Sequence, residues 1–318
     1  MVIVSAVIPT RGRPELLRRA VRSALAQTLR EIEVVVVIDG EDPVTRLAME
    51  EWAQQDGRLH VVALAVSVGG SDARNRGVDA ASGEWIAFLD DDDEWLPGKL
   101  QTQLDALKTS TAPALIGSCK MIARTPGKDY IWPRRTPGKD EQLGEYLLAR
   151  HTLTRGEGYI QTSTFFVRRA LMLAQPFKSG QRKHQDTEWV LRLGRLPGIQ
   201  VIIVDQTLAI HNIEEDRTTV SSKSNWQYSL EWVRRDRHLF TPRALSGFVL
   251  HQIASEASDQ GDWRGFPVLL LEALRHGKST PLDYAIFLAM WLLPRRRRRR
   301  LRDWMSRRPG LRALVQPI

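Results

Sequence analysis

The sequence predicts an α/β fold with a mostly parallel sheet that is flanked by helices. In the first half of the chain, short apolar runs rich in Val and Ile alternate with stretches in which apolar residues recur at helical spacing. Near-continuous apolar strands separated by helices are typical of parallel strands buried on both faces. From about residue 225 to about residue 293 the pattern is helical, which predicts a helical extension after the sheet.

Each predicted element has its own local signal. The expected helices 14–26 and 43–55 begin with proline, which the first helical turn tolerates. A third helix is expected to open at Gly69 and Gly70, with Ser71 as its N-cap, and to end at Ala81. Two further helices are expected at 97–107 and 186–196. The expected strands are 2–8 (ended by Pro9), 33–38, 59–65, 85–89, 114–122, 159–167 and 201–210, with a loop at 125–138.

The net charge of +9 is confined to one end of the chain. Residues 295–318 contain ten arginines and one acid, Asp303, which leaves 36 basic and 36 acidic side chains in the rest. The main part of the chain is therefore neutral and gives no reason to expect a nucleic-acid partner. The tail also shows no regular pattern of aromatic residues interleaved with basic ones, of the kind that RNA-binding segments have.

Cysteine content and the N-terminal pattern predict the compartment. A single cysteine, Cys119, excludes an internal disulfide framework and fits a reducing compartment. Met1 leads straight into an apolar strand pattern with no basic segment and cleavage site, so no signal peptide is expected. The predicted location is cytoplasmic.

An apolar decamer directly before the arginine run predicts contact with a membrane. Residues 284–293 are apolar, but a spanning helix needs about 20 residues. Arg295–Arg300 follow after one proline, and an apolar helix beside basic residues suits an anionic membrane surface. We therefore expect a peripheral position at the inner face of the cell membrane. A buried final helix with a solvated tail is the alternative.

The most informative motif is the run Asp90–Asp93, which follows the expected strand 85–89 and precedes Glu94-Trp95-Leu96-Pro97. In open α/β sheets, ligands bind at the C-terminal ends of the strands. Carboxylate oxygens there suit Mg²⁺ or Mn²⁺, and such an ion can hold a nucleotide diphosphate. The alternative is an acidic turn in solvent.

Five motifs occur in the order PTRGRP, VVVIDG, GGSDARNRG, FLDDDDEWLP and HQDTEWVLRL. Over roughly residues 1–215 this order resembles family-2 glycosyltransferases with a GT-A fold. The resemblance implies an inverting enzyme that moves a sugar from a nucleotide-sugar donor to a hydroxyl of a glycan or lipid-linked acceptor, in cell-surface polysaccharide or glycan synthesis. The expected domains are a catalytic domain 1–220, a helical extension 221–294 and the arginine-rich tail 295–318.

The resemblance also implies which residues bind the nucleotide. Pro9, Thr10 and Arg11 correspond to nucleotide contacts, and Asp39 to the carboxylate that accepts from N3–H of uracil or thymine. This favours a UDP-sugar, with a dTDP-sugar as the alternative. Ile38 stands where many relatives have a second aspartate.

The glycine-rich helix start carries two further candidates. Gly70 lets the backbone approach a ligand closely at a helix N-terminus. Arg74 is expected to pair with Asp39 or Asp91 or to touch the nucleotide, and a purely structural ion pair is the alternative.

Within the acidic run, Asp90 and Asp92 correspond to the ends of the family's Asp-x-Asp motif. Asp92 is expected to ligate Mn²⁺ or Mg²⁺ directly, and Asp91 to face the ribose or make an outer-shell contact. Asp93 and Glu94 are expected only to solvate the loop. His211 corresponds to a histidine that contacts the metal or the diphosphate in many relatives, and a structural role is the alternative.

Asp186 corresponds to the catalytic base, which takes a proton from the acceptor hydroxyl. Many relatives have a Glu-Asp pair here, whereas this chain has Gln185-Asp186. Without the like charge, Asp186 is expected to ionise more readily. The alternative for Asp186 is a helix N-cap. His184 is expected to be exposed.

Three other functions compete with this interpretation. A nucleotidyltransferase would be expected to carry a glycine-rich basic loop after the first strand, but PTRGRP has one glycine. A dinucleotide-dependent dehydrogenase would need GxGxxG, which is absent. A non-catalytic carbohydrate- or membrane-docking protein on a degenerate transferase fold is the remaining alternative, and the presence of Asp39, Asp92 and Asp186 argues against it.

Overall fold

A computed structural model describes residues 1–112, 114–153, 155–213 and 225–293. These residues form two compact units, each described here by itself. The first unit contains residues 1–132 and the chain from residue 160 to the end of the last strand; the second contains residues 133–159 and the helices after residue 225. The expected domains 1–220 and 221–294 are continuous along the chain, whereas these units are not. The expected tail 295–318 lies outside the described residues.

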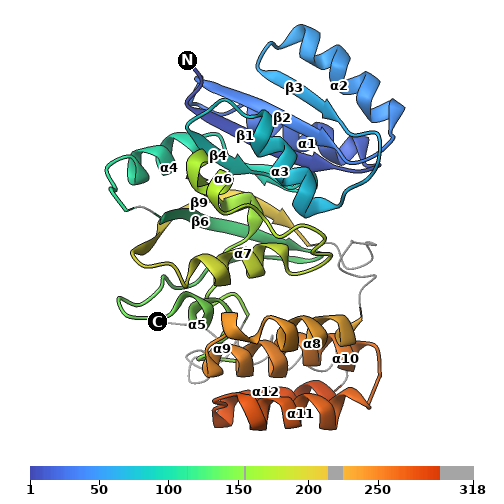
Figure 1. Cartoon of the computed structure of the whole chain (residues 1–318), viewed down its shortest axis with the longest axis vertical. Helices are drawn as coiled ribbons and strands as arrows, with labels where there is room; N and C mark the ends of the chain where they lie inside the picture. The colour runs from blue at the N-terminus through green and yellow to red at the C-terminus, as the bar shows by residue number, and fades with distance from the viewer. Residues whose placement is uncertain (113, 154, 214–224, 294–318) are drawn as a thin grey trace. The chain divides into compact units, whose positions relative to one another are not determined.

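The first unit is built on one sheet with the strand order β3-β2-β1-β4-β8-β6-β9-β5, and β7 pairs with β6 (Figure 1). The strands are β1 Val4–Thr10, β2 Ile32–Ile38, β3 Leu59–Ala63, β4 Trp85–Phe88, β5 Glu94–Trp95, β6 Ala114–Thr125, β7 Lys128–Trp132, β8 Phe166–Arg168 and β9 Ile199–Asn212. As predicted, β3, β2, β1 and β4 pair in parallel. Beyond β4 the sheet is mixed: β8 runs antiparallel to β4 and β6, while β6 and β9 are parallel.

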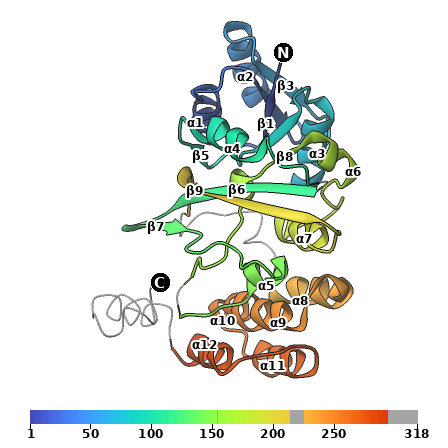
Figure 2. The same ribbon diagram turned by 90° about the vertical axis from the view of Figure 1, so that its left-hand side faces the viewer.

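Helices cover both faces of this sheet, which confirms the predicted α/β class. They are α1 Pro14–Leu25, α2 Pro43–Gln55, α3 Gly70–Ala80, α4 Lys99–Leu107, α6 Arg169–Ala174 and α7 Gln185–Leu193. Figure 2 shows α1 and α4 on one side of the strands and α3 and α6 on the other. All seven residues of β2 are buried, as a strand covered on both faces requires.

Helix α3 packs unusually close to the parallel strands. An added Cβ at Gly77 would lie 2.3 Å from Val7 Cγ1 and 3.1 Å from Val37 Cγ2. Only glycine fits between α3 and strands β1 and β2 at this point. The close packing brings the N-terminus of α3 to the C-terminal edge of the sheet.

The second unit is helical. Its elements are α5 Leu143–Leu148, α8 Trp226–Arg235, a 3₁₀ turn η3 Arg237–Leu239, α9 Pro242–Gly247, a π-helical segment η4 Phe248–Ile253, α10 Ala254–Asp259, α11 Gly265–His276 and α12 Pro281–Leu292. α9, η4 and α10 follow one another without a break, and both α11 and α12 pack against η4. In the part of the chain that the structure describes, no helix has both the length and the apolar character needed to cross a bilayer.

Several local predictions were wrong. Pro9 does not end β1, because Pro9 and Thr10 pair with β2. Ser71 is not the N-cap of α3; Gly69 is, and Ser71 is buried in the first turn. The expected loop 125–138 contains β7, and the expected strand 159–167 is a 3₁₀ turn, η1 Thr162–Thr164, followed by the short β8.

Candidate active site

The acidic run lies at the C-terminal edge of the sheet, as predicted, and is held on both sides. β4 ends at Phe88, and Leu89 N–H still bonds to the carbonyl of Val7. After the run, Glu94 of β5 pairs with Ile210 of β9. The four aspartates therefore span a short turn between two anchored strands.

The aspartates differ in exposure. Asp91 and Asp93 are fully buried, whereas Asp90 and Asp92 are partly exposed. Carboxylate oxygens of Asp90, Asp92 and Asp93 lie within 4.8 Å of one another. Three hard oxygen ligands at this spacing fit Mn²⁺ or Mg²⁺. We call Asp90, Asp92 and Asp93 the carboxylate cluster.

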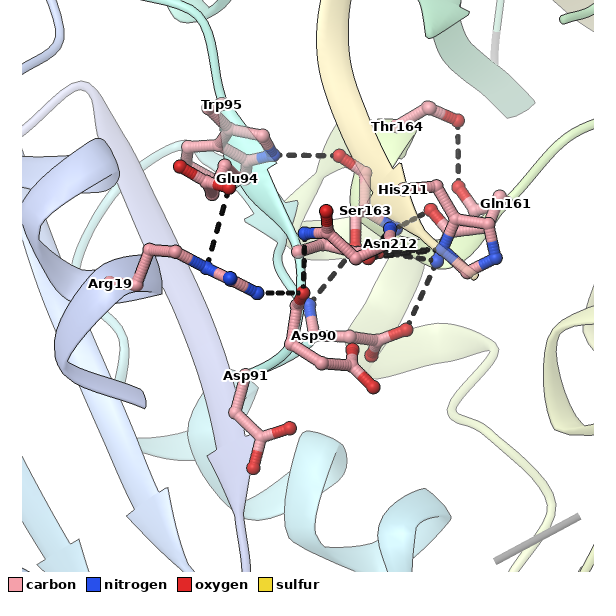
Figure 3. Close-up of polar contacts among 12 residues, drawn as sticks. Arg19, Asp90, Asp91, Glu94, Trp95, Gln161, Ser163, Thr164, His211 and Asn212 are labelled. Carbon is pink, nitrogen blue, oxygen red and sulfur yellow. Dashed lines mark hydrogen bonds and ion pairs between the residues drawn. The ribbon is translucent and has the colours of Figure 1, made fainter. Parts of the chain in front are cut away.

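Asp93 is the centre of a buried polar network, so the prediction that it solvates the loop was wrong. Its carboxylate accepts hydrogen bonds from Gln161 Nε2 (2.9 Å), Ser163 Oγ (2.7 Å) and the backbone N–H of Asn212 (3.1 Å). Figure 3 shows Gln161, Ser163 and His211 converging on this side of the acidic turn. These partners fix the position of the Asp93 carboxylate within the carboxylate cluster.

His211, a predicted metal contact, reaches the carboxylate cluster through Asp93. Its Nδ1 lies 3.0 Å from Asp93 Oδ1. Burial lowers the pKa of His211, but the negative charges of Asp93, Asp92 and Asp90 and the bond to Asp93 outweigh it and raise the pKa to about 9. Carboxylates commonly orient metal-bound histidines in this way. The group of side chains whose ligand atoms lie within 4.8 Å of one another consists of Asp90, Asp92 and Asp93 and does not include His211.

The backbone of the turn is held from both sides. The carbonyl oxygen of Asp92 accepts from Arg19 Nη2 (2.7 Å) and Asn212 Nδ2 (2.8 Å) (Figure 3). Arg19 Nε also lies 3.3 Å from Glu94 Oε1. Glu94 therefore anchors the turn to α1 and does more than solvate the loop.

Asp91 contacts two residues of the first motif, Thr10 and Arg13, and Arg13 also lies 3.5 Å from Asp92 Oδ2. Thr10 Oγ1 donates to Asp91 Oδ2 (2.7 Å), and Arg13 Nη2 lies 2.7 Å from Asp91 Oδ1. Burial raises the pKa of Asp91 to about 7, although Arg13 and Thr10 act in the opposite direction. The predicted nucleotide contacts Thr10 and Asp91 are thus bonded to each other, while Pro9 is half-buried and Arg11 is exposed beside them.

Asp39, at the end of β2, holds the loop that leads into α3. Its carboxylate accepts from Ser67 Oγ (2.9 Å) and from the backbone N–H groups of Val68 (2.6 Å) and Gly69 (3.1 Å). The structure thus places Asp39 at the same edge as the acidic run. Its predicted contact with a pyrimidine base would compete with, or add to, these bonds.

Arg74 joins α3 to the acidic run. Its Nη2 lies 2.5 Å from Asp90 Oδ1, so the predicted pairing with Asp39 or Asp91 was wrong. Its Nη1 donates to Gln185 Oε1 at 2.8 Å. An added Cβ at Gly70 would lie 3.1 Å from both of these atoms, so glycine leaves room for the contact.

Asp186 lies in the first turn of α7, next to the residue that Arg74 holds. It is not the N-cap, which is His184. Burial raises the pKa of Asp186; the backbone N–H of Thr187 and the charge of Arg74 lower it, and the charge of Asp90 raises it again. The expectation that Asp186 ionises more readily beside Gln185 than beside a glutamate stays a prediction, because the raised pKa is relative to an ordinary aspartate. A carboxylate with a raised pKa is a stronger base.

The backbone beside Asp186 is strained. Among the described residues His184 is the one non-glycine residue with positive φ, at 61°. It is not exposed as predicted: burial, together with the nearby charge of Lys183, lowers its pKa to about 3. A neutral histidine in a left-handed conformation thus sets the direction in which α7 starts. Such strain is often found at functional sites.

Sequence reasoning missed five residues that bond to the acidic run: Arg13, Arg19, Gln161, Ser163 and Asn212. Arg13 was part of the motif PTRGRP, and its charge was the available signal. Gln161 also donates to Asp90 Oδ2 (3.1 Å), and Ser163 Oγ accepts from the backbone N–H of Asp90 (3.0 Å). No local pattern marks these two residues, because their partners lie about 70 positions earlier in the chain.

Together, the mixed sheet and the carboxylate cluster at its edge define a GT-A type transferase. Residues 1–349 of TarS from S. aureus, solved with UDP-GlcNAc, match 98% of this chain and 84% of that chain, with a TM-score of 0.53 and 18% identity. At this identity the likeness shows the fold. The sequence pattern described as "Glycosyl transferase family 2" matches residues 5–174. The chain belongs to glycosyltransferase family 2.

Two relatives whose names state an activity agree with the family. The amylovoran biosynthesis glycosyltransferase AmsB of Erwinia amylovora is 26% identical over 255 residues, which are 78% of this chain and 82% of AmsB. The GalNAc(5)-diNAcBac-PP-undecaprenol beta-1,3-glucosyltransferase of Campylobacter jejuni is 32% identical over 150 residues, 46% of this chain and 48% of that enzyme. The second match thus spans about half the length of its relative.

Proposed function

We propose that this glycosyltransferase inverts the anomeric configuration as it moves a sugar from a UDP-linked donor to an acceptor hydroxyl, with a dTDP-linked donor as the alternative. One observation carries the proposal: Arg74 bonds both to Asp90 of the carboxylate cluster and to Gln185, the residue before Asp186. The cluster and the candidate base are thereby brought together by one side chain. A donor diphosphate at the cluster would place its sugar toward Asp186.

The carboxylate cluster is proposed to hold Mn²⁺ or Mg²⁺, with Asp92 as a direct ligand and His211 as a further contact. Asp92 is partly exposed and therefore accessible to an ion from solvent. A bound divalent cation would neutralise the charge that develops on the leaving diphosphate. Pro9 and Thr10 at the end of β1, and Arg11 directly after it, are proposed to contact the nucleotide.

Asp186 is proposed as the general base. It would take the proton from the acceptor hydroxyl while the oxygen attacks the anomeric carbon, and the bond from that carbon to the diphosphate would break on the opposite side. Attack from the side opposite the leaving group inverts the configuration. The raised pKa of Asp186 favours this proton transfer.

The proposed acceptor is a glycan or a lipid-linked glycan in cell-surface polysaccharide synthesis. AmsB is named for a polysaccharide, and the Campylobacter enzyme for an undecaprenol-linked substrate. The predicted cytoplasmic location at the inner face of the membrane, with Arg295–Arg300 toward anionic lipid, would bring such acceptors within reach. The arginine run itself lies outside the described residues.

The test uses purified full-length chain with UDP-, dTDP-, GDP- and CDP-sugars, with Mn²⁺ or EDTA. Nucleotide release should need the metal and should be fastest with UDP- or dTDP-sugars, and the product anomer is read by NMR. Asp186→Asn should retain donor binding but lower transfer by about 10²–10⁴-fold. Asp92→Asn should abolish metal-dependent UDP binding.

Asp105→Asn, on the exposed surface of α4, is the matched control and should match the wild type. Less than about a tenfold loss in Asp186→Asn would assign the proton transfer to another residue. Release of pyrophosphate from a nucleoside triphosphate and a sugar phosphate would instead indicate a nucleotidyltransferase. No turnover of any donor, with sugar binding retained, would favour the non-catalytic docking protein.

A further inference from the structure

The last two helices of the second unit each have a buried face and an exposed apolar stripe. In α12, Ile286, Phe287, Met290 and Trp291 are buried, whereas Leu288 and Leu292 are exposed. In α11, Leu269 and Ala273 are buried, whereas Leu271 and Leu274 are exposed. Spacings of three and four residues place each pair of exposed leucines on one side of its helix.

The two stripes form one face. α11 and α12 lie side by side in both views (Figures 1 and 2), and both pack against η4 and α10. Because they bury their inner sides against the same layer, their outer stripes point the same way. Trp263, just before α11, adds an indole ring 5.2 Å from the ring of Trp291 in α12. We call Trp263, Leu271, Leu274, Leu288 and Leu292 the leucine face.

The exposure of this face is large for apolar side chains. Its five members are between 44% and 68% exposed. Single exposed leucines are common, but a cluster on adjacent helices marks an interaction site. The face lies on the second unit and includes no residue of the candidate active site.

The charges around the leucine face are positive. All residues from 264 to 293 are described, and their two carboxylates, Glu272 and Asp283, are both buried. Glu272 pairs with Arg234 and Arg237, and Asp283 with Arg243. Arg275 and Lys278 are exposed, whereas Arg264 is exposed but paired with Asp262, which lies directly before Trp263 in the chain. In sequence, Arg295–Arg300 follow three residues after Leu292.

We propose that the leucine face docks on the surface of an anionic lipid bilayer, with its leucines and Trp263 at the boundary between headgroups and acyl chains. Apolar side chains bordered by basic residues bind such surfaces, and tryptophan favours this depth. α12 has 12 residues, about 18 Å of helix, so it lies on the membrane and does not cross it.

The charges favour lipid over a second copy of the chain. Two leucine faces in contact would bring Arg275 and Lys278 of both copies together, and the carboxylate of Asp262 is already paired with Arg264, whereas anionic headgroups supply the opposite charge. The inference rests on the proposed membrane location but not on sugar transfer, so donor turnover is measured in the same samples to separate the two.

The test is co-sedimentation of the full chain with vesicles of phosphatidylcholine and phosphatidylglycerol. The variant Leu271→Ser/Leu274→Ser/Leu288→Ser/Leu292→Ser should lose about tenfold or more of its partitioning, with unchanged donor turnover. The matched control is Val44→Ser/Leu47→Ser on α2, whose side chains are 69% and 60% exposed. The control should bind vesicles like the wild type.

A second readout uses the wild-type chain in case the fourfold variant does not fold. Bromine-labelled acyl chains should quench its fluorescence, and Trp263→Phe should remove part of that quenching. The proposal would be overturned if the fourfold variant partitioned into vesicles as strongly as the wild type. It would also be overturned if Trp263→Phe left the quenching unchanged. A wild-type dimer in light scattering that becomes a monomer in the fourfold variant without any vesicle binding would overturn it too, because the face would then join two copies.

Discussion

At the scale of single residues, Asp39 has two tasks that can be separated by mutation. It is the proposed partner of the donor's pyrimidine ring. It also holds the loop before α3 through hydrogen bonds from Ser67, Val68 and Gly69. Asp39→Ala should weaken UDP binding by about 1–3 kcal/mol, because a polar base edge loses its partner. Ser67→Ala removes one loop bond and keeps the carboxylate.

Calorimetry with UDP and CDP distinguishes the two tasks of Asp39. Asp39→Ala should weaken UDP binding more than CDP binding, because cytosine lacks the N3–H donor. Ser67→Ala should have a small effect that is the same for both nucleotides. Equal affinity of the wild type for UDP and CDP would remove Asp39 from base recognition.

Lys99 is a buried cation outside the candidate site. Among the residues that the structure describes, its Nζ has no hydrogen-bond partner, and it lies 4.3 Å from the ring centre of Trp95. Burial lowers the pKa of Lys99 to about 8, from 10.5 in the ordinary range, while nearby Cys119 acts weakly in the opposite direction. The folded protein therefore bears a desolvation cost that is full below pH 8 and shrinks as the pH rises toward 10.5.

Lys99→Met should accordingly stabilise the fold at pH 7, by about 1–3 kcal/mol. The gain should shrink at pH 9.5, where the folded wild type has released the proton and the unfolded chain still holds it. Urea unfolding at the two pH values measures both. A gain that grows with pH would contradict the assignment of the low pKa to Lys99.

At the scale of elements, the contact of α3 with β1 and β2 limits what residue 77 can be. Gly77→Ala places a methyl group 2.3 Å from Val7 Cγ1, so the fold should lose about 1–3 kcal/mol. Gly57→Ala is the matched control, since an added Cβ there has no atom within 4 Å, and it should change stability by less than about 0.5 kcal/mol. The urea midpoints of the two variants report the difference.

The parallel half of the sheet could be predicted because its signal is local. Ile32–Ile38 is apolar at every position but one, and the helices around it have clear apolar stripes. The turn Pro126-Gly127 was interpreted as part of a loop, but Gly127 has φ 94° and joins β6 to β7 as a hairpin. Proline and glycine mark a turn without telling whether strands flank it.

Candidate site residues could be predicted where they belong to a sequence motif. They could not be predicted where their hydrogen-bond partners lie in a distant segment of the chain. The acidic run stands out in the sequence and Asp186 was identified from the family resemblance, whereas the bonds of Gln161 and Ser163 to the run depend on how η1 folds against β4. Apolar Phe165 and Phe166 suggested a strand for the whole stretch. The buried polar bonds to Asp90 and Asp93 favour a tight turn there instead.

At the scale of the whole molecule, the concentration of charge in residues 295–318 predicts salt-dependent membrane binding. Replacing Arg295–Arg300 with Gln should weaken binding to anionic vesicles in low salt but leave turnover of a soluble acceptor unchanged. Wild-type binding should fall as salt rises, because screening shortens the attraction to about a Debye length, roughly 8 Å at physiological salt. Vesicle binding that does not change with salt concentration would leave the tail without a role at the membrane.

The grouping of residues 133–159 with the later helices limits how the chain can be divided. Tyr146 of α5 is buried, and an added Cβ at Gly247 of α9 would lie 2.1 Å from the carbonyl oxygen of Leu148. Glu145 of α5 also accepts a hydrogen bond from Thr241. A fragment that stops after β9 would keep the whole candidate site. It would also leave α5 without the helices against which it packs. Recombinant shortening to a fragment that ends after β9 should therefore yield insoluble protein, and exchange of the helical unit between relatives would have to move 133–159 together with the C-terminal helices.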